Sequence, residues 1–144
     1  MRKAGGGEVR FTFDDMQRVM QKRTCSYCGI KMTLTNGEAT DQCIDHVYPL
    51  SDAFDGYGGE NLAENLATCC RACNSSKRND HVYDFYERSD KFTPLLWTAF
   101  VAEFGARFIG RELTALEIEQ FKRGFAEEAA ELRAIQQRET GATG

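Results

Sequence analysis

The sequence is poor in proline and histidine, it has no excess of positive charge, and it has no long run of apolar residues. Only 2 of its 144 residues are proline, 42% are hydrophobic and 28% are charged, which excludes a disordered chain and indicates a globular one. The longest strongly apolar stretch, residues 95–104, is interrupted by Glu103 and is shorter than the ~20 residues that span a bilayer. Met1-Arg2-Lys3 leads into glycines rather than an apolar segment. We therefore expect no secretory signal and a cytoplasmic protein.

The excess of acidic over basic residues limits how this chain could bind nucleic acid. Lysine and arginine number 18 against 22 acidic residues, which gives a formal net charge of −4. The segments before and after residue 92 are both net negative. Any contact with DNA must therefore depend on a local basic patch, and we expect weak binding that falls steeply with salt.

Cysteine, by contrast, is plentiful. Four of the 6 cysteines form two CxxC pairs, Cys25/Cys28 and Cys70/Cys73. Each pair can present two thiolates from a tight knuckle, and two knuckles complete a tetrahedral Zn²⁺ site. The alternatives are buried free thiols that share this spacing, or a redox pair, which would need a preceding strand of a βαβ unit. The two remaining cysteines are Cys43 and Cys69. We interpret them as small buried hydrophobic residues, and the alternative is that they bind a metal.

The residue pattern around the knuckles predicts short helices and strands. Apolar residues at helical spacing, with a Thr12/Asp15 capping box, predict a helix over residues 12–23. The Asn36-Gly37 pair favours a tight turn and predicts a hairpin. The two strands of this hairpin are expected at residues 31–35 and 38–44, followed by a loop at residues 49–59. A further strand is expected at residues 65–69, and residues 74–78 are expected in the opening turns of a helix.

The last third of the chain predicts two long helices. Residues 95–109 are largely apolar, and a Thr114/Glu117 capping box begins a helix that extends to about Arg138. An apolar stripe on this last helix, broken at Glu128, is interpreted as packing on the rest of the chain. Homodimerisation and binding of a partner are the alternatives. We therefore divide the chain into a domain over residues 12–92 and a C-terminal helical extension over residues 93–140, which packs on that domain or mediates oligomerisation.

Three motifs stand in and between the knuckles: Cys-x-Tyr-Cys-Gly from Cys25, Asp-His-x-x-Pro-Leu-Ser from Asp45, and Asn-Leu-x-x-x-Cys-x-x-Cys-Asn from Asn65, which is followed by Lys77. Together they resemble the HNH nuclease family. Each piece alone is a weak match, but their order in a short chain is specific. Over about residues 12–85, the resemblance implies an α+β fold. This fold has a ββα-metal core between two zinc knuckles, with an N-terminal helix and the C-terminal helical extension.

The same residues supply what hydrolysis of a phosphodiester requires, namely a base for the attacking water, a cation and a means of holding the phosphate. Histidine has an unperturbed pKa of ~6.5 and suits a general base at neutral pH. His46 stands at the end of a predicted strand, whereas His81 could share the active-site face only if the helix after the second knuckle continued. Asp45 and the side-chain oxygen of Asn74 are hard ligands that suit Mg²⁺ or Mn²⁺. These two ligands carry one negative charge, so we expect weak metal binding until a substrate phosphate adds to it.

The resemblance adds roles that the residues alone do not give. Asn65 is matched to the family's middle asparagine, which bonds the backbone near the catalytic histidine, and Asn61 is the competing candidate. Asn74 stands where the family often has its last histidine, which gives a His-Asn-Asn variant and leaves the choice of metal open. Three basic residues in or beside the predicted helix are expected to contact phosphates: Arg71, Lys77 and Arg78.

The sequence thus predicts a metal-dependent endonuclease that hydrolyses DNA phosphodiester bonds, by nicking or by double-strand cleavage, with His46 as the general base. Zn²⁺ on the four cysteines is expected to be structural, and Mg²⁺ or Mn²⁺ catalytic. One alternative is a partner-dependent subunit of a phage packaging or restriction assembly. The other is a non-catalytic zinc-stabilised module that binds nucleic acid. DNA is the expected partner. The C-terminal helices could also form a homodimer or bind a partner protein, and the sequence does not decide between these possibilities.

Overall fold

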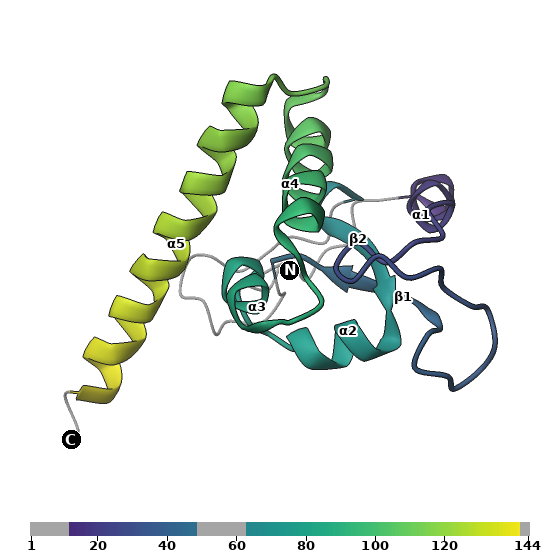
Figure 1. The fold of residues 1–144 in the computed structure, drawn as a ribbon, viewed down its shortest axis with the longest axis horizontal. Coiled ribbons are helices and arrows are strands. Elements are labelled where there is room, and N and C mark those ends of the chain that lie inside the picture. Colours follow the sequence, from purple (N-terminus) through teal and green to yellow (C-terminus); the bar gives the residue numbers. More distant parts are fainter. Residues whose placement is uncertain (1–11, 49–62, 142–144) are drawn as a thin grey trace, which may run out of the picture.

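The computed structural model describes residues 12–48 and 63–141 of the chain (Figure 1). The loop predicted over residues 49–59 and the competing asparagine, Asn61, lie outside the described residues.

A two-stranded sheet and a short helix form the centre of the structure. Strand β1 (Gln42–His46) pairs antiparallel with β2 (Leu66–Cys70), and His46 lies opposite Leu66. Helix α2 (Arg71–Lys77) follows β2 directly and contacts both strands. All five residues of β2 are buried, because α1 contacts this strand as well as α2. This is the ββα arrangement of a mixed α+β fold, as predicted.

The hairpin predicted around Asn36-Gly37 is wrong. A type I′ turn needs positive φ at both central residues. Gly37 has φ +105°, but Asn36 is not among the described residues with positive φ. Residues 33 and 41 meet instead in an isolated parallel bridge, so the segment between them is a loop rather than two paired strands.

The carboxylate of Asp41 holds this loop together. Its Oδ1 accepts hydrogen bonds from the hydroxyls of Thr33 and Thr35 at 2.7 and 2.5 Å. Its Oδ2 accepts from the backbone N–H groups of Gly37 and Glu38 at 2.9 and 2.8 Å. These donors, the Thr35 hydroxyl first, hold the pKa of Asp41 well below its usual value. The Asp41 carboxylate thus takes its hydrogen bonds from its own loop, and the pairing of β1 with β2 begins only at the next residue, Gln42.

Helix α1 (Phe13–Met20) is shorter than predicted but begins where expected. Thr12 and Asp15 form the capping box, with the backbone N–H of each residue donating to the side chain of the other at 2.9 and 3.1 Å. At the other end, the side-chain amide of Gln42 donates to the carbonyl oxygen of Met20 at 2.8 Å. This bond satisfies a carbonyl at the end of the helix, and the chain turns there towards the first knuckle.

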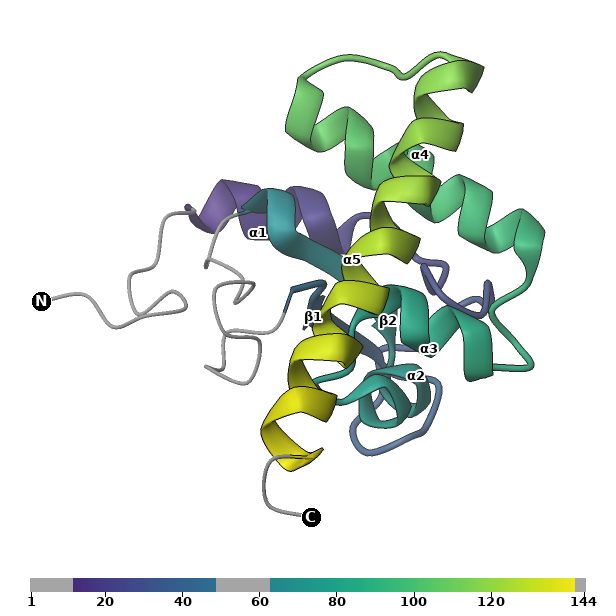
Figure 2. The same ribbon diagram turned by 90° about the vertical axis from the view of Figure 1, so that its left-hand side faces the viewer.

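Three further helices follow the centre, namely α3 (Val82–Arg88), α4 (Pro94–Ile109) and α5 (Ala115–Gly141). Helices α4 and α5 form a helical hairpin, and α5 runs along one side of the molecule past α3 (Figures 1 and 2). The capping box predicted for α5 is present, since Thr114 and Glu117 each accept a bond from the other's backbone N–H. No helix in the described part of the chain has the length and apolar character needed to cross a membrane.

Aromatic side chains fill the space between the centre and these helices. Neighbouring rings lie with their centroids 4.8–6.3 Å apart, a spacing typical of packed aromatic pairs. Phe125 and Leu132 of the apolar stripe on α5 are buried, which shows that the stripe packs within the chain over this length. The principal members of the aromatic core are Tyr27, Phe85, Phe92, Trp97, Phe100, Phe104 and Phe125.

Candidate functional site

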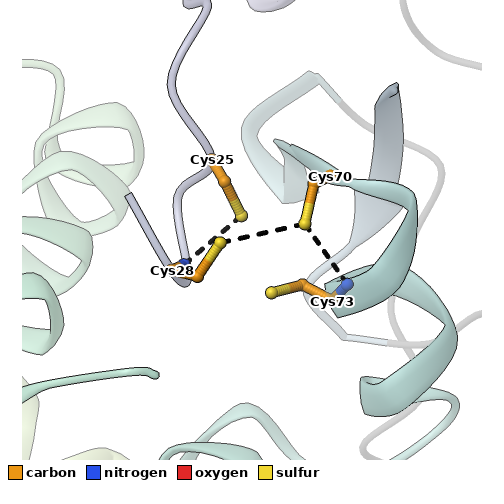
Figure 3. Close-up of side chains that lie close together, drawn as sticks. All are labelled: Cys25, Cys28, Cys70 and Cys73. Carbon is orange, nitrogen blue, oxygen red and sulfur yellow. Dashed lines mark hydrogen bonds between the residues drawn. The ribbon is translucent and has the colours of Figure 1, made fainter. Parts of the chain in front are cut away.

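The four cysteines of the two CxxC pairs converge, as predicted (Figure 3). Cys25 and Cys28 come from the loop after α1, Cys70 ends β2, and Cys73 lies in the first turn of α2. Their sulfur atoms all lie within 4.8 Å of one another, and the Sγ atoms of Cys28 and Cys70 are 3.8 Å apart. Zn–S bonds of ~2.3 Å in a tetrahedron place the sulfurs about 3.8 Å apart. The geometry therefore fits a metal ion held by four thiolates.

Hydrogen bonds within the cluster already favour negative charge on sulfur. The backbone N–H groups of Tyr27 and Cys28 both donate to Sγ of Cys25 at 3.3 Å. The hydrogen bond with the Cys73 thiol, and to a smaller extent the backbone N–H groups, lower the pKa of Cys25 to about 4. The hydrogen bond between the two thiols also raises the pKa of Cys73. Burial raises the pKa of Cys28 to about 11. Four thiolates at this spacing would repel one another, and a divalent cation is what would stabilise all four.

Cys43 and Cys69 lie outside this cluster and face each other across β1 and β2. Cys69 is fully buried, and burial raises the pKa of its thiol far above its usual value. This agrees with the interpretation of Cys69 as a buried hydrophobic residue, whereas Cys43 is only half-buried.

Asp45 is buried at the end of β1 and is held by one of its two carboxylate oxygens. Its Oδ2 accepts from the phenol of Tyr27 at 2.6 Å and lies 3.1 Å from Nζ of Lys77. Among the described residues, Oδ1 of Asp45 has no hydrogen-bond partner. One oxygen is thus anchored while the other remains available to a ligand. The part played by Tyr27 was not foreseen, although this tyrosine stands between the first two cysteines.

The placement of Lys77 corrects one of the predicted phosphate contacts. Its side chain is completely buried, and Nζ lies 3.1 and 3.4 Å from the carbonyl oxygens of Val47 and His46 and 3.1 Å from Asp45. A lysine ammonium has three N–H donors, so these acceptors account for all of them. Lys77 is therefore an internal tie between α2 and the end of β1 and has no N–H left for a phosphate.

His46 and Asn65 lie close together at the same end of the sheet. His46 is the last residue of β1 and is half-buried. Asn65 is buried just before β2, and its side chain accepts from the backbone N–H of Tyr48 at 2.8 Å and donates to the carbonyl of Tyr48 at 2.9 Å. Its own carbonyl oxygen accepts from the N–H of Val47 at 2.8 Å. These are backbone bonds of the kind that the resemblance implied for Asn65.

Helix α2 carries the other predicted site residues. Asn74 is half-buried and lies one turn before Lys77, so it shares the helix face that meets β1. In the described part of the chain its side chain has no hydrogen-bond partner, which leaves its oxygen free to bind a cation. Arg71 and Arg78 are exposed at the two ends of the helix.

His81 does not join this face, because α2 does not continue. The helix ends at Lys77, and Arg78 takes a positive φ of 52°. His81 then caps α3, with Nδ1 accepting from the N–H of Tyr83 at 3.0 Å. The ring is buried, and its Nε2 lies 2.6 Å from a carboxylate oxygen of Glu128 on α5.

Comparison with known proteins agrees with this geometry. Residues 25–80 match the family model described as HNH endonuclease. The matched segment includes both knuckles, β1, β2 and α2, and it therefore contains the four cysteines, Asp45, His46, Asn65 and Asn74. His81, Tyr83 and Glu128 lie outside it. A search of curated proteins gave no match.

Proposed function

We propose that this chain, in which residues 25–80 are an HNH endonuclease domain, is a metal-dependent endonuclease that hydrolyses phosphodiester bonds of DNA. The observation that carries the proposal is the composition of the end of β1. Asp45 and His46 stand there side by side, and Asn74 lies on the helix face that packs against this strand. Among the described residues, Oδ1 of Asp45 and the side chain of Asn74 have no hydrogen-bond partner, and His46, next to Asp45 in the chain, is half-buried.

In the proposed reaction His46 is the general base. It removes a proton from a water molecule, which attacks phosphorus in line with the leaving 3′-oxygen. Asp45 and Asn74 would hold Mg²⁺ or Mn²⁺, which supplies electrostatic stabilisation of the leaving oxygen and of the charge on the phosphate. Asn65 and Lys77 do not take part in the reaction directly. They fix the backbone on either side of Val47, the residue that follows His46.

The charges around Asp45 suggest that metal and substrate bind together. Asn74 is neutral, and the only carboxylate of the proposed ligand pair lies 3.1 Å from a lysine ammonium. This lysine offsets the negative charge that would attract a divalent cation. A phosphate brings the missing negative charge, so the metal concentration for half-maximal activity should fall as the DNA concentration rises.

Zinc on the four cysteines has a different proposed role. Four sulfur ligands leave no open position for water or substrate, so this ion would be structural. It would join the first knuckle to the junction of β2 and α2. Asn74 lies on α2, and Asp45 and His46 lie on β1, which pairs with β2, so an ordered junction of β2 and α2 is a condition for their alignment.

Arg71 and Arg78 are the proposed phosphate contacts. Both are exposed, and neither touches the interior in the way that Lys77 does. Such contacts position the sugar–phosphate backbone without reading bases, so we expect little sequence preference. The net charge of −4 makes this binding weak and sensitive to salt.

Cleavage of supercoiled plasmid tests the proposal. Wild-type protein is incubated with Mg²⁺ or Mn²⁺ beside an EDTA control, His46→Ala and Asp45→Asn. We expect cleavage by the wild type alone, and open-circle product that precedes linear product would show nicking. A zinc-loaded, folded wild type that cuts with neither metal would contradict the proposal. It would favour the partner-dependent subunit or the non-catalytic module instead.

A further inference from the structure

Glu128 is the one polar interruption in the apolar stripe of α5 between Phe125 and Leu132, and it lies outside the segment that matches the HNH family. Its carboxylate oxygen Oε1 accepts a hydrogen bond from the phenol of Tyr48 at 2.6 Å. The same oxygen lies 2.6 Å from Nε2 of His81, whose side chain is almost fully buried. The break in the stripe is therefore the point at which α5 meets two polar groups from elsewhere in the chain.

Both groups donate to Glu128. Nδ1 of His81 accepts a backbone N–H, so a neutral ring carries its proton on Nε2, which faces the carboxylate. Tyr48 is held as a phenol, because burial first, and then the bond to Glu128, raises its pKa far above the usual value. One oxygen of Glu128 thus receives two bonds of fixed direction, and both tie α5 to the part of the chain that contains the proposed active site.

Tyr48 is the residue that connects Glu128 to that site. It stands two residues after His46, and Asn65 binds both its backbone N–H and its carbonyl. Asn65 thus fixes the main chain of Tyr48, and Glu128 fixes its side chain. The preceding residue, Val47, is bonded through its N–H to the carbonyl of Asn65 and through its own carbonyl to Lys77. Asn65 and Lys77 lie within the family match, whereas Glu128 is contributed by α5.

We propose that Glu128 is a positioning residue of the active site, which fixes Tyr48 and through it the backbone that follows His46. The inference rests on the proposed function for its effect on catalysis. It makes α5 part of the structure that supports the active site rather than an added helix. In this role Glu128 contacts neither the attacking water nor DNA. Its loss should therefore lower kcat and leave KM nearly unchanged.

Three variants separate positioning from simple support of α5. Glu128→Leu removes both bonds but suits the apolar stripe, and Tyr48→Phe removes the phenol link alone. Glu128→Gln retains a side-chain oxygen that can accept from both donors. Glu131→Leu is the matched control, because it places the same apolar residue at an exposed position on the same helix. We expect kcat to fall about 10-fold in Glu128→Leu and in Tyr48→Phe, and to fall no further in the double variant. Glu128→Gln and Glu131→Leu should retain wild-type kcat.

Amide hydrogen exchange provides a readout that does not depend on cleavage. The N–H groups of Val47 and Tyr48 are both bonded to Asn65, so they report directly on the segment after His46. Glu128→Leu should speed their exchange roughly 10-fold, while Glu131→Leu leaves it unchanged. If the wild type proves not to be a nuclease, this exchange still decides whether Glu128 fixes Tyr48. Unchanged exchange in Glu128→Leu overturns the inference, as does faster exchange with wild-type kcat in an active enzyme.

Discussion

The ammonium of Lys77 lies 3.1 Å from Oδ2 of Asp45, and both side chains are buried. The carbonyl oxygens of Val47 and His46 complete the set of acceptors around this ammonium. One side chain from α2 thereby neutralises a buried carboxylate and satisfies the backbone where β1 ends. The helix that carries Asn74 is thus tied to the strand that carries His46 at the place where the proposed chemistry requires the two to be aligned.

Replacement of Lys77 by methionine should therefore destabilise the protein strongly. Methionine fills a similar volume, but among the described residues it leaves the Asp45 side chain with Tyr27 alone, and it removes the bonds that Nζ makes to the carbonyl oxygens of Val47 and His46. Loss of one member of a buried ion pair costs about 3–5 kcal/mol. Urea unfolding followed by circular dichroism would measure this change. Lys31→Met, at an exposed lysine, is the control and should stay within about 0.5 kcal/mol of the wild type. Equal stability of the two variants would show that the Lys77–Asp45 contact contributes nothing.

Lys77 also shows where inference from the sequence stops. The charge of a lysine beside a metal-binding motif suggests a phosphate contact. Only the packing of α2 on β1 reveals that the ammonium turns inwards. The position of His81 likewise depended on where α2 ends, because helical spacing would carry His81 to the active-site face only if the helix continued beyond Lys77.

Features set by neighbouring residues were predicted well. The capping boxes at Thr12 and Thr114 each depend on residues three apart, and both are present. The CxxC pairs were informative because a metal site needs few residue types at fixed spacing. The Asn36-Gly37 hairpin failed because the Asp41 carboxylate gathers the donors of that segment into a loop.

Contacts between distant residues could not be predicted. Glu128 was noticeable as a break in an apolar stripe, yet its partner Tyr48 lies 80 residues earlier in the chain. Neither residue has a spacing or motif that points to the other. Only the packing of α5 across α3 and α4 brings them together.

The packing of α4 against the start of α5 predicts opposite effects for two glycines. A Cβ at Gly105 would lie 2.4 Å from a methyl carbon of Leu113 and 3.3 Å from the ring of Phe121. Both side chains would have to move, so Gly105→Ala should cost about 1–3 kcal/mol. A Cβ at Gly124 meets no atom within 4 Å, and alanine is the better helix former, so Gly124→Ala should stabilise by about 0.5–1 kcal/mol. Thermal melts of the two variants would test this contrast, and a stabilising Gly105→Ala would contradict it.

Removal of one knuckle cysteine should abolish metal binding and cooperative folding together. Cys70 caps α2, with Sγ accepting from the N–H of Cys73 at 3.4 Å, and serine is itself a favourable N-cap residue. Any large loss of stability in Cys70→Ser would therefore come from the loss of the metal and not from the loss of the helix cap. Structural zinc contributes on the order of 10 kcal/mol to folding, whereas a cap contributes about 1 kcal/mol. We expect one zinc per chain in the wild type, and in Cys70→Ser a loss of zinc and of the sharp thermal transition.

The control for this experiment is Cys43→Ser, which changes a half-buried cysteine outside the four-cysteine cluster. It should keep its zinc and melt close to the wild type. Elemental analysis of both purified variants gives the metal content directly. A Cys70→Ser variant that melts normally without zinc would refute the structural role of the metal.

Arg78 combines a strained backbone with an exposed charge, and two substitutions separate these properties. Its φ of 52° is a conformation that glycine adopts readily and other residues seldom do. Such strain costs about 1–3 kcal/mol, while glycine forfeits about 0.5–1 kcal/mol through the greater freedom of the unfolded chain. Arg78→Gly should therefore stabilise the protein by about 1 kcal/mol in urea unfolding. It should also weaken DNA binding and reduce the salt dependence by about one phosphate contact.

Arg78→Lys retains both the charge and the strain. Its stability and its DNA affinity should therefore stay close to those of the wild type, with any small loss in affinity uniform across DNA sequences, because a phosphate contact reads no bases. Fluorescence anisotropy with two unrelated duplexes at several salt concentrations measures these changes. If Arg78→Gly bound DNA as tightly as Arg78→Lys at every salt concentration, Arg78 would not be a phosphate contact. The basic surface would then have to be sought around Arg71 at the other end of α2, which is also exposed.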